Sequence, residues 1–300
     1  MLYDNIRIMK QQLRLTFQTM RLRQWPKNIF VMAALVFDRQ LFNLDSLAIT
    51  LSAVVLFCLT SSLIYIINDL ADIKADALHP EKRHRPLASG QLSRTWAIST
   101  AIILGLLTIP TAFLLNLSLG LIITAYFLLM LVYSLWLKHI PLIDVMVIAV
   151  GFVLRVAGGL VVIVTETFSP WLFVATTFLA LFIALGKRRS EHDLLKQKAA
   201  DHRRVLDGYS LELLDQLLTI VLSSTLMTYC LYTFSSPIAP GNYSMMLTIP
   251  FVIYGLFRYL FLIRTGHIGG APEEVILTDR PMQAAIGLWG LTVTAILYLI

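Results

Sequence analysis

The chain has 300 residues, of which 57% are hydrophobic and 14% are charged, and its mean hydropathy is +0.75. This composition excludes a soluble globular domain and predicts an all-α, polytopic bundle of membrane helices. The formal net charge of +6 is concentrated in the segments between apolar runs, which indicates a membrane surface and not a nucleic acid as its partner. Cys58 and Cys230 lie inside apolar runs, so they indicate neither a disulfide framework nor a metal cluster.

The first 27 residues are basic and amphipathic. Basic residues are interspersed with apolar ones in this segment, at Arg7, Lys10, Arg14, Arg21 and Arg23. No continuous apolar run with a small-residue cleavage site follows them, so the segment is not expected to be a signal peptide. We expect residues 1–27 to lie on the cytoplasmic surface of the membrane.

Apolar runs long enough to cross a bilayer fill most of the remaining chain. A hydrocarbon core of about 30 Å is crossed by roughly 20 residues of α-helix. The sequence therefore predicts about nine transmembrane helices, in a single domain of residues 28–300. We place them at residues 28–44, 47–67, 96–115, 117–137, 142–164, 170–186, 214–234, 244–263 and 283–300.

Basic residues mark one side of this predicted bundle. Except for Arg39, Arg155 and Arg258, all 24 lysines and arginines lie in residues 1–27, 68–95, 138–141, 187–213 and 264–282. By the positive-inside rule these segments are cytoplasmic. The histidines lie in the same segments, at spacings that match no metal site. A polar face on one side only favours an enzyme with a cytoplasmic substrate over a transporter, which needs polar groups near the midplane.

Residues 68–90, NDLADIKADALHPEKRHRPLASG, carry the densest set of polar side chains. If the helix of the preceding span continues, Asn68, Asp72 and Asp76 share one face at spacings of about 6 Å, and Asp69 points about 100° away. Carboxylates at this spacing repel each other, and a divalent cation turns the repulsion into attraction. Magnesium takes one or two carboxylates from a protein and further oxygens from water and substrate phosphates.

A basic run follows the acidic residues in the same loop. Lys82, Arg83 and Arg85 are close to the carboxylates in sequence, and ammonium and guanidinium groups bind phosphate oxygens. The stretch therefore predicts a site for Mg²⁺ and a phosphate-bearing substrate. The alternative interpretation is a juxtamembrane loop of mixed charge.

Further candidate residues lie at the ends of other spans or within them. Lys27, Tyr65, Lys138 and Lys187 lie near the same membrane surface, where each also has an ordinary interpretation as an interfacial anchor. Arg155 lies about 20 Å from the cytoplasmic start of its span. An arginine at that depth costs at least about 2.5–3.5 kcal/mol. We therefore expect Arg155 to face a polar cavity or an anion.

Several enzyme classes have no supporting motif in the sequence. It contains no P-loop, no dinucleotide-binding glycine pattern, no nucleophile elbow and no zinc signature. Nucleotide hydrolysis, hydride transfer and serine hydrolysis are therefore not predicted. The acidic and basic residues described above favour a site for Mg²⁺ and a diphosphate at the mouth of a helix bundle. The space among the helices would hold a lipid tail.

The whole chain resembles the UbiA-type superfamily of membrane prenyltransferases. Residues 68–76 match the NDxxDxxxD signature of that superfamily. More narrowly, the chain is similar to the decaprenyl-phosphate phosphoribosyltransferase branch. The runs that carry this resemblance are QWPKN (24–28), HPEKRHRP (79–86), YSLWLKHIPLIDV (133–145), GFVLRVAGG (151–159), GKRRSE (186–191) and TDRP (278–281).

The resemblance implies an activity and a set of site residues. It implies transfer of 5-phosphoribosyl from phosphoribosyl diphosphate to a polyprenyl phosphate of the decaprenyl type, with release of diphosphate. The implied cofactor is Mg²⁺, and the implied location is the cytoplasmic face of a prokaryotic plasma membrane. Asn68 and Asp72 are expected to bind the metal and to act in catalysis with Asp76. The implied substrate-binding residues are Lys27, Tyr65, Lys82, Arg83, Arg85, Lys138, Arg155 and Lys187.

One run departs from the wider superfamily. Ordinary prenyltransferases carry a second aspartate motif after the sixth span, whereas residues 187–193 read KRRSEHD, with only Glu191 and Asp193 as carboxylates. A site with one acidic arm and a basic wall suits phosphoribosyl diphosphate and a phosphate acceptor better than a prenyl diphosphate. One alternative is a prenyltransferase that moves an isoprenoid from its diphosphate to an aromatic or other small acceptor. Another is a transporter or lipid-binding protein without chemistry. The sequence leaves open the acceptor's chain length, the number of Mg²⁺ ions and whether the protein is a homo-oligomer.

Overall fold

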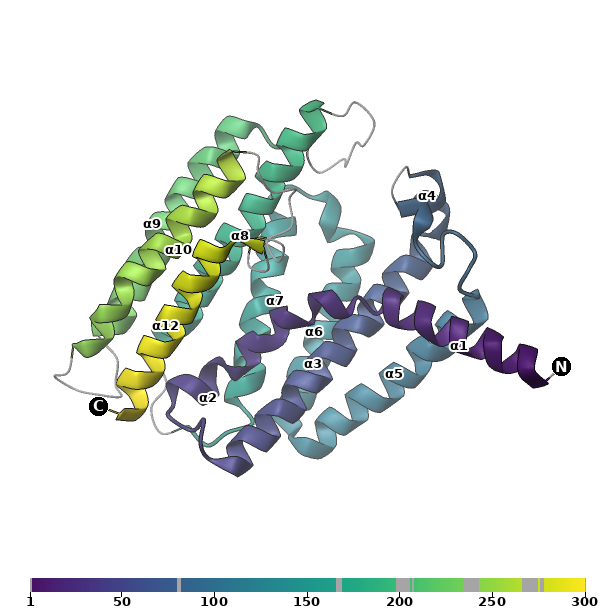
Figure 1. The fold of residues 1–300 in the computed structure, drawn as a ribbon, viewed down its shortest axis with the longest axis horizontal. Helices are drawn as coiled ribbons and strands as arrows, with labels where there is room; N and C mark the ends of the chain where they lie inside the picture. Colours follow the sequence, from purple (N-terminus) through teal and green to yellow (C-terminus); the bar gives the residue numbers. More distant parts are fainter. Residues whose placement is uncertain are drawn as a thin grey trace.

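The fold is described from a computed structural model of the chain. The structure describes residues 2–79, 82–165, 169–197, 206, 208–234, 243–265, 275 and 278–299. Every regular element within these residues is a helix, so the predicted all-α class is confirmed. The helices form two groups that lie side by side, with α7 between them (Figure 1).

The N-terminal group contains helices of very different lengths, including 3₁₀ helices that are labelled η. In chain order they are α1 (Leu2–Thr19), η1 (Leu22–Met32), α2 (Ala33–Phe37), α3 (Leu44–Ala71), α4 (Ile73–Leu78), η2 (Lys82–His84), α5 (Arg94–Leu115), α6 (Leu117–Leu135), η3 (Leu137–His139) and α7 (Ile143–Leu160). The C-terminal group contains α8 (Pro170–Gln197), α9 (Leu211–Phe234), η5 (Ser244–Thr248), α10 (Ile249–Arg264) and α12 (Arg280–Leu299).

Polar residues with short side chains start several of the long helices. The Asn43 side chain accepts hydrogen bonds from the backbone at the start of α3, Ser93 does so for α5, and Asn116 does so for α6. These caps satisfy backbone N–H groups that have no partner within a helix. Between the caps, continuous apolar sequence allows each helix to extend across a bilayer.

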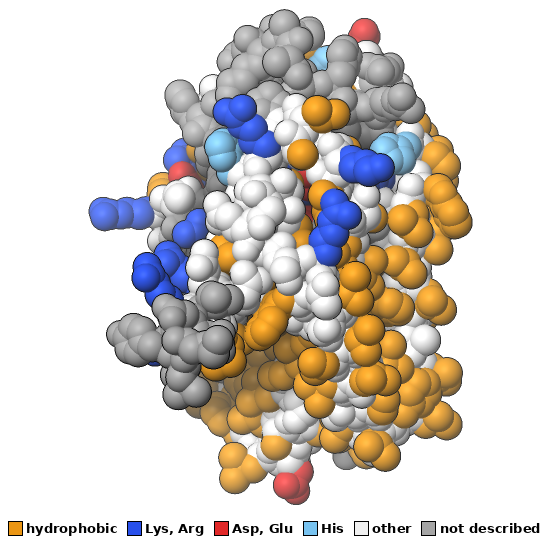
Figure 2. Space-filling view, turned by 90° about the vertical axis from the view of Figure 1, so that its right-hand side faces the viewer, with side chains coloured by type: hydrophobic (Ala, Val, Ile, Leu, Met, Phe, Trp, Pro, Cys, Tyr) orange, Lys and Arg blue, Asp and Glu red, His pale blue; other side chains and the backbone are white. Residues whose placement is uncertain are grey.

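Eight of the described helices are long and apolar enough to cross a membrane. They coincide with eight of the nine predicted spans, from residues 47–67 to residues 283–300, and confirm that the protein is an integral membrane protein. Figure 2 shows lysines and arginines in the upper half of one face and a broad hydrophobic surface below them. This division is expected where one end of a bundle meets water and its side meets lipid.

The predicted first span, residues 28–44, is not a single α-helix. Leu22–Met32 form η1, with Pro26 inside it, and only Ala33–Phe37 are α-helical before the chain turns. At about 2.0 Å per residue for a 3₁₀ helix and 1.5 Å for an α-helix, the helical part of the predicted span, residues 28–37, extends about 18 Å. The prediction of one continuous helix was therefore wrong. The prediction that residues 28–44 span the bilayer stays a prediction.

Non-α backbone at membrane depth is tolerated when protein surrounds it. Val31 of η1 is fully buried. Its carbonyl oxygen lies so close to Gly159 of α7 that a side chain at Gly159 would collide with it. Glycine at this position therefore allows α7 to cover the irregular segment.

Each group of helices has its own apolar core. Phe57, Leu119 and Ile123 are fully buried in the N-terminal group, and Phe182 and Leu214 are fully buried in the C-terminal group. The helix α7 contributes to both cores, because its N-terminal turn packs into the C-terminal one. The two groups are therefore joined along α7 and α8.

Candidate active site

The predicted acidic site lies where α3 ends. The α-helix stops at Ala71, Asp72 adopts φ −92° and ψ 6°, and the short helix α4 begins at Ile73. The helix is therefore interrupted at Asp72, where the sequence allowed it to continue through Asp76. Backbone hydrogen bonds of 2.9 Å to Asn68 O and 2.8 Å from Asp76 N nevertheless span the interruption at Asp72, so the three residues keep an approximately helical spacing.

Two of the carboxylates in this stretch are buried and paired with arginine. Asp69 accepts hydrogen bonds from Arg21 at 2.6 Å and from Arg85 at 3.3 Å. Asp76 accepts one from Arg85 at 2.6 Å. The guanidinium group of Arg85 thus joins both carboxylates. Through these contacts Asp69 connects the acidic stretch to the basic run and to the residues that follow α1.

Asp72 differs from these two carboxylates because it stays accessible. Its side chain is 32% exposed and lies 3.2 Å from Nζ of Lys138, which belongs to η3. Lys138 therefore lies beside the predicted metal ligands, as required of a residue that binds a substrate phosphate. The side chain of Asn68 makes no hydrogen bond to any described residue.

The donor set at Asn68 and Asp72 fits a magnesium ion that shares its ligands with substrate and water. An amide oxygen and a carboxylate are hard oxygen donors, and magnesium commonly takes few ligands from the protein itself. Within the described residues no group of three or more His, Cys, Asp or Glu side chains is placed to hold a metal ion. The arrangement therefore fits a metal held jointly with phosphate and not one held in an all-protein cage.

The other candidate residues lie in several different elements. Lys82 and Arg83 are exposed in η2, and neither pairs with a carboxylate of a described residue. Lys187 is half-buried near the end of α8 and likewise has no ion pair with a described residue. Lys27 donates a hydrogen bond to Gln24 at 2.6 Å. The ring of Tyr65 lies beneath the guanidinium group of Arg21, 4.8 Å from the ring centroid.

Arg155 is buried inside the N-terminal group, at 7% exposure. It donates to Asn28 Oδ1 at 2.8 Å, to the Gly151 carbonyl at 2.9 Å and to the Tyr126 hydroxyl at 2.7 Å. Its guanidinium group also lies over the Tyr126 and Phe152 rings. All of these partners are neutral, so no carboxylate of a described residue balances the charge. The predicted role in substrate binding stays a prediction.

A second charged cluster, which the sequence did not identify as a unit, joins the start of α7 to the end of α8. Arg188 donates to Asp144 at 2.6 Å and to Glu191 at 2.6 Å. Arg188 and Asp144 are 1% and 0% exposed. Asp144 lies inside an apolar span, and a carboxylate in that position requires a partner. The sequence therefore indicated that Asp144 is paired, but it did not indicate that the partner is Arg188.

Tyr209 extends this cluster to the segment that precedes α9. Its hydroxyl donates to Asp144 at 2.7 Å and accepts from the Leu142 N–H at 2.6 Å. Leu142 has φ +66°, a strained value for leucine. Burial and the hydrogen bond to Asp144 raise the pKa of Tyr209 above its ordinary value. The tyrosine therefore holds, in its protonated form, the turn that follows Lys138.

The resemblance run TDRP also has a structural role. Arg258 of α10 donates to Asp279 at 2.8 Å, immediately before α12. This hydrogen bond lowers the pKa of the Asp279 carboxyl, which also accepts from the Met282 N–H. Arg258 thus meets its partner at the start of α12 and does not remain an isolated charge in its span.

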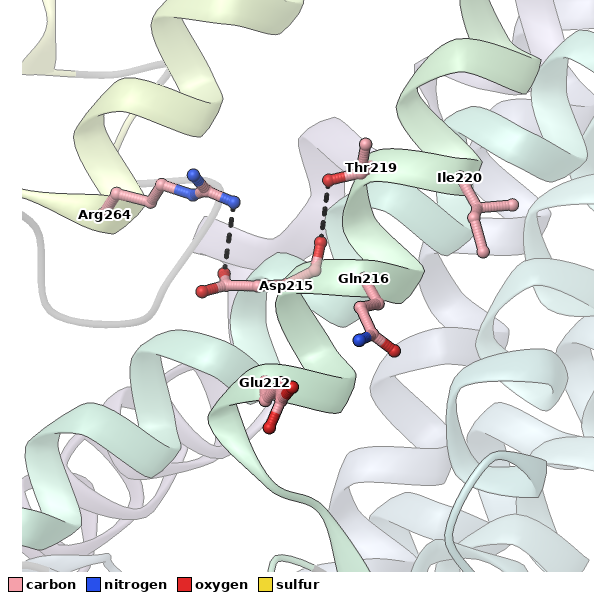
Figure 3. Close-up of a pocket in the computed structure, with 6 residues that line it drawn as sticks. All are labelled: Glu212, Asp215, Gln216, Thr219, Ile220 and Arg264. Atoms are coloured by element: carbon pink, nitrogen blue, oxygen red, sulfur yellow. Dashed lines mark hydrogen bonds and ion pairs between the residues drawn. The ribbon is translucent and has the colours of Figure 1, made fainter.

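A surface hollow of about 710 Å³ lies on α9 and the end of α10 (Figure 3). Figure 3 shows Arg264 reaching across to Asp215, at 3.5 Å, over the hollow. Asp215 also accepts from Arg189 at 2.8 Å. No predicted site residue lines the hollow, and its carboxylate at Asp215 is already paired. We therefore place the candidate site at the end of α3 and not here.

Known proteins resemble this chain in sequence along most of its length. The decaprenyl-phosphate phosphoribosyltransferase of Corynebacterium glutamicum is 33% identical over 94% of this chain and 86% of its own. That of Mycolicibacterium smegmatis is 33% identical over 94% and 92%. That of Mycobacterium tuberculosis is 31% identical over 93% and 92%.

The fold has close neighbours among solved structures. A UbiA homologue from Archaeoglobus fulgidus bound to GPP and Mg²⁺ has a TM-score of 0.69 at 20% identity, covering 94% of this chain and 99% of that one. A structure of digeranylgeranylglyceryl phosphate synthase has a TM-score of 0.68 at 16% identity, with coverage of 94% and 99%. The sequence pattern of the UbiA prenyltransferase family matches residues 28–271. The fold, the acidic motif and the relatives that align with most of the chain agree. The chain belongs to the UbiA prenyltransferase family.

Proposed function

We propose that this enzyme transfers the 5-phosphoribosyl group from phosphoribosyl diphosphate to a polyprenyl phosphate of the decaprenyl type and releases diphosphate. Three relatives named for decaprenyl-phosphate phosphoribosyl transfer align with 93–94% of the chain. The alignments thus include both helix groups and the acidic stretch. The enzyme is accordingly a glycosyl (phosphoribosyl) transferase embedded in a membrane.

One observation favours this donor over a prenyl diphosphate: the residues near the end of α8 form no second aspartate motif, and one of their two carboxylates, Glu191, is paired with an arginine. Glu191 is bonded to Arg188 at 2.6 Å, and Asp193 lies 3.9 Å from Arg189. Glu191 is therefore engaged by Arg188, whereas Asp193 is 37% exposed and makes only this long contact, so a second metal ion would find a single available carboxylate there. Metal binding then depends on the single acidic motif that contains Asn68 and Asp72, and Lys138 lies beside that motif.

A metal on Asn68 and Asp72 would neutralise negative charge on the diphosphate of the donor. Lys138, at 3.2 Å from Asp72, is placed to contact a phosphate bound beside it. Asp76 holds Arg85 in position through their 2.6 Å contact, so we assign Asp76 a positioning role in addition to any metal contact through water. The outer wall of the donor site is assigned to Lys27, Tyr65, Lys82, Arg83 and Lys187.

Arg155 is assigned to substrate binding from within the bundle. Its charge is buried among neutral partners, and a buried cation without a counter-charge gains most from an anionic ligand. Tyr126 and Asn28 fix the direction of the guanidinium group. A phosphate that enters between the helices would therefore find a preorganised donor of hydrogen bonds.

The reaction exchanges one bond at the anomeric carbon for another. The bond from that carbon to the diphosphate oxygen breaks, and a bond from an oxygen of the lipid phosphate to the same carbon forms on the opposite face, with inversion. Lysines beside the diphosphate stabilise the charge that builds on it as it leaves. The lipid phosphate is already anionic at neutral pH, so no strong general base is required. Positioning and electrostatics supply most of the rate.

The location follows from the same charges. The basic segments that surround the acidic motif are expected on the cytoplasmic side, where phosphoribosyl diphosphate is supplied. We therefore place the active site at the cytoplasmic face of a prokaryotic plasma membrane, with the acceptor reaching it from the bilayer.

Donor competition in purified membranes tests the proposal. Radiolabelled phosphoribosyl diphosphate is supplied with polyprenyl phosphate and Mg²⁺, with and without EDTA, and label is followed into the organic phase. We expect lipid-soluble label that disappears with EDTA and with Asp72→Ala. Absence of such label, together with turnover of a prenyl diphosphate and an aromatic acceptor, would replace the proposal with ordinary prenyl transfer.

A further inference from the structure

The helix α1 is attached to the bundle by one face only. On that face Leu15, Thr16 and Thr19 are buried. Thr16 accepts a hydrogen bond from Trp96 at 3.0 Å, and Gln12 donates to the Gln91 carbonyl at 2.9 Å. In Figure 1 the helix projects from the edge of the bundle, with the chain's N-terminus at its far end. The remaining faces of α1 are thus left uncovered by the described part of the chain.

The uncovered side carries two parallel stripes of different chemistry. Met9, Leu13 and Phe17 follow one another at four-residue spacing, so they form one apolar stripe, and they are 48%, 43% and 53% exposed. Lys10 and Arg14 each follow a member of this stripe by one residue, which places them about 100° around the helix. Both are exposed, as is Arg7. The helix therefore presents an apolar stripe with a basic stripe beside it.

We propose that this face of α1 is a docking surface for anionic phospholipid headgroups at the cytoplasmic leaflet. The apolar stripe is suited to the boundary between headgroups and acyl chains, and the basic stripe is suited to the negative charges just above it. The α1 helix is the element that leads through Arg21 to Asp69 and Tyr65. Docking of α1 would therefore fix one wall of the candidate site relative to the membrane surface.

The lipid is favoured over a second copy of the chain by charge. Arg7, Lys10 and Arg14 carry the same sign, so an identical helix placed stripe against stripe would bring like charges together, and Asp4 is the single acidic residue of α1. An anionic leaflet offers the opposite charge over the whole stripe. Three basic residues near such a surface are together expected to strengthen docking by about a hundredfold.

Hydrogen exchange in nanodiscs tests the docking directly. The full-length protein is placed in nanodiscs of phosphatidylcholine alone, or with about one third of the lipid replaced by phosphatidylglycerol, and exchange of the amides of α1 is followed by mass spectrometry. We expect slower exchange in α1 with phosphatidylglycerol and unchanged exchange in α3. The readout does not involve turnover, so it is independent of the proposed donor.

Two variants and one matched control make the test specific. Arg7→Gln/Lys10→Gln/Arg14→Gln is expected to remove the lipid-dependent protection. Leu13→Gln/Phe17→Gln, which keeps every charge, is expected to remove it as well. The control Arg23→Gln/Lys74→Gln/Arg94→Gln removes three exposed cytoplasmic charges away from the stripe and is expected to keep it. Equal exchange in both lipids, equal loss in the control, or protection that rises with the number of protein copies per disc would overturn the proposal.

Discussion

The C-terminal ends of α3 and of α8 both carry charged residues, but the burial and pairing of these residues differ. Arg188 and Asp144, near the end of α8, are 1% and 0% exposed and lie 2.6 Å apart. Asp72, at the end of α3, is 32% exposed and lies 3.2 Å from Lys138. A buried pair fixes the helices that contribute it, whereas an accessible pair contributes little to stability and remains available to a ligand.

The same division runs through the acidic motif itself. Asp69 and Asp76 are buried against Arg21 and Arg85, so they hold the loop in place. Asn68 and Asp72 are the residues that we propose bind the metal ion and substrate. Charged residues that are adjacent in sequence therefore have different tasks, and burial together with pairing separates those tasks. The predictions below test this separation.

Arg188→Met should have the largest effect, and on stability. It leaves Asp144 as a buried carboxylate without its arginine, which typically costs about 3–5 kcal/mol. A lowered melting temperature of the purified protein in nanodiscs would register the loss. The double variant Arg188→Met/Asp144→Leu should recover most of it, because both charges are then removed. A single variant that melts like the native protein would show that the pair does not hold α7 and α8 together.

Asp72→Ala should abolish most of the activity without lowering the melting temperature. Loss of a group that stabilises charge in the transition state costs about 3–4 kcal/mol, which corresponds to a rate loss of roughly a hundredfold to a thousandfold. The matched control is Asp193→Ala, which removes a carboxylate near the end of α8. We expect turnover within about twofold of native for this control, since the contact with Arg189 is 3.9 Å long and partly exposed. A site with two acidic arms predicts comparable losses for both variants.

Lys138→Met should weaken donor binding to a smaller degree. A hydrogen bond to a charged group is worth about 1.5–3 kcal/mol, so a tenfold to hundredfold loss in kcat/KM is expected. Stability should change little, since Lys138 and Asp72 are both accessible. The measurement is kcat/KM for phosphoribosyl diphosphate beside a thermal melt. A large drop in melting temperature with unchanged kinetics would assign Lys138 to the scaffold instead.

Tyr209→Phe should have the smallest effect, on stability. It removes the hydrogen bonds to Asp144 and from Leu142, at about 1 kcal/mol each. Because the pKa of Tyr209 is raised in the folded protein, its contribution is complete below the ordinary tyrosine value of 10.0 and declines as the pH rises beyond that value. The difference in melting temperature between native and variant proteins should therefore be constant at neutral pH and shrink in alkali. A difference in melting temperature that grows as the pH rises would contradict this prediction.

Much of the architecture was predictable because bilayer thickness and charge bias act on continuous stretches of sequence. Eight long apolar runs became eight long helices. Residues 28–44 did not become one helix, because hydropathy does not distinguish an α-helix from the 3₁₀ segment that α7 covers at Gly159. Local spacing likewise placed Asn68, Asp72 and Asp76 together.

The partners of charged side chains were not predictable from sequence. Asp72 meets Lys138, and Asp144 meets Arg188 and Tyr209, only because segments distant in sequence pack together. Arg155 was expected at an anion or a polar cavity, and the structure shows it among neutral oxygens and aromatic rings. Pairing of this kind depends on the tertiary fold, whereas the single-residue signal that a buried charge requires a partner was already in the sequence.

Equilibrium binding of phosphoribosyl diphosphate tests the central claim most directly. Native protein, Asp72→Ala and Asp193→Ala in nanodiscs are each titrated with radiolabelled donor, with Mg²⁺ and with EDTA. We predict Mg²⁺-dependent binding that Asp193→Ala retains and Asp72→Ala loses. Loss of binding in Asp193→Ala to the same extent as in Asp72→Ala would contradict the account, because the carboxylates near α8 would then belong to the site and not to the scaffold.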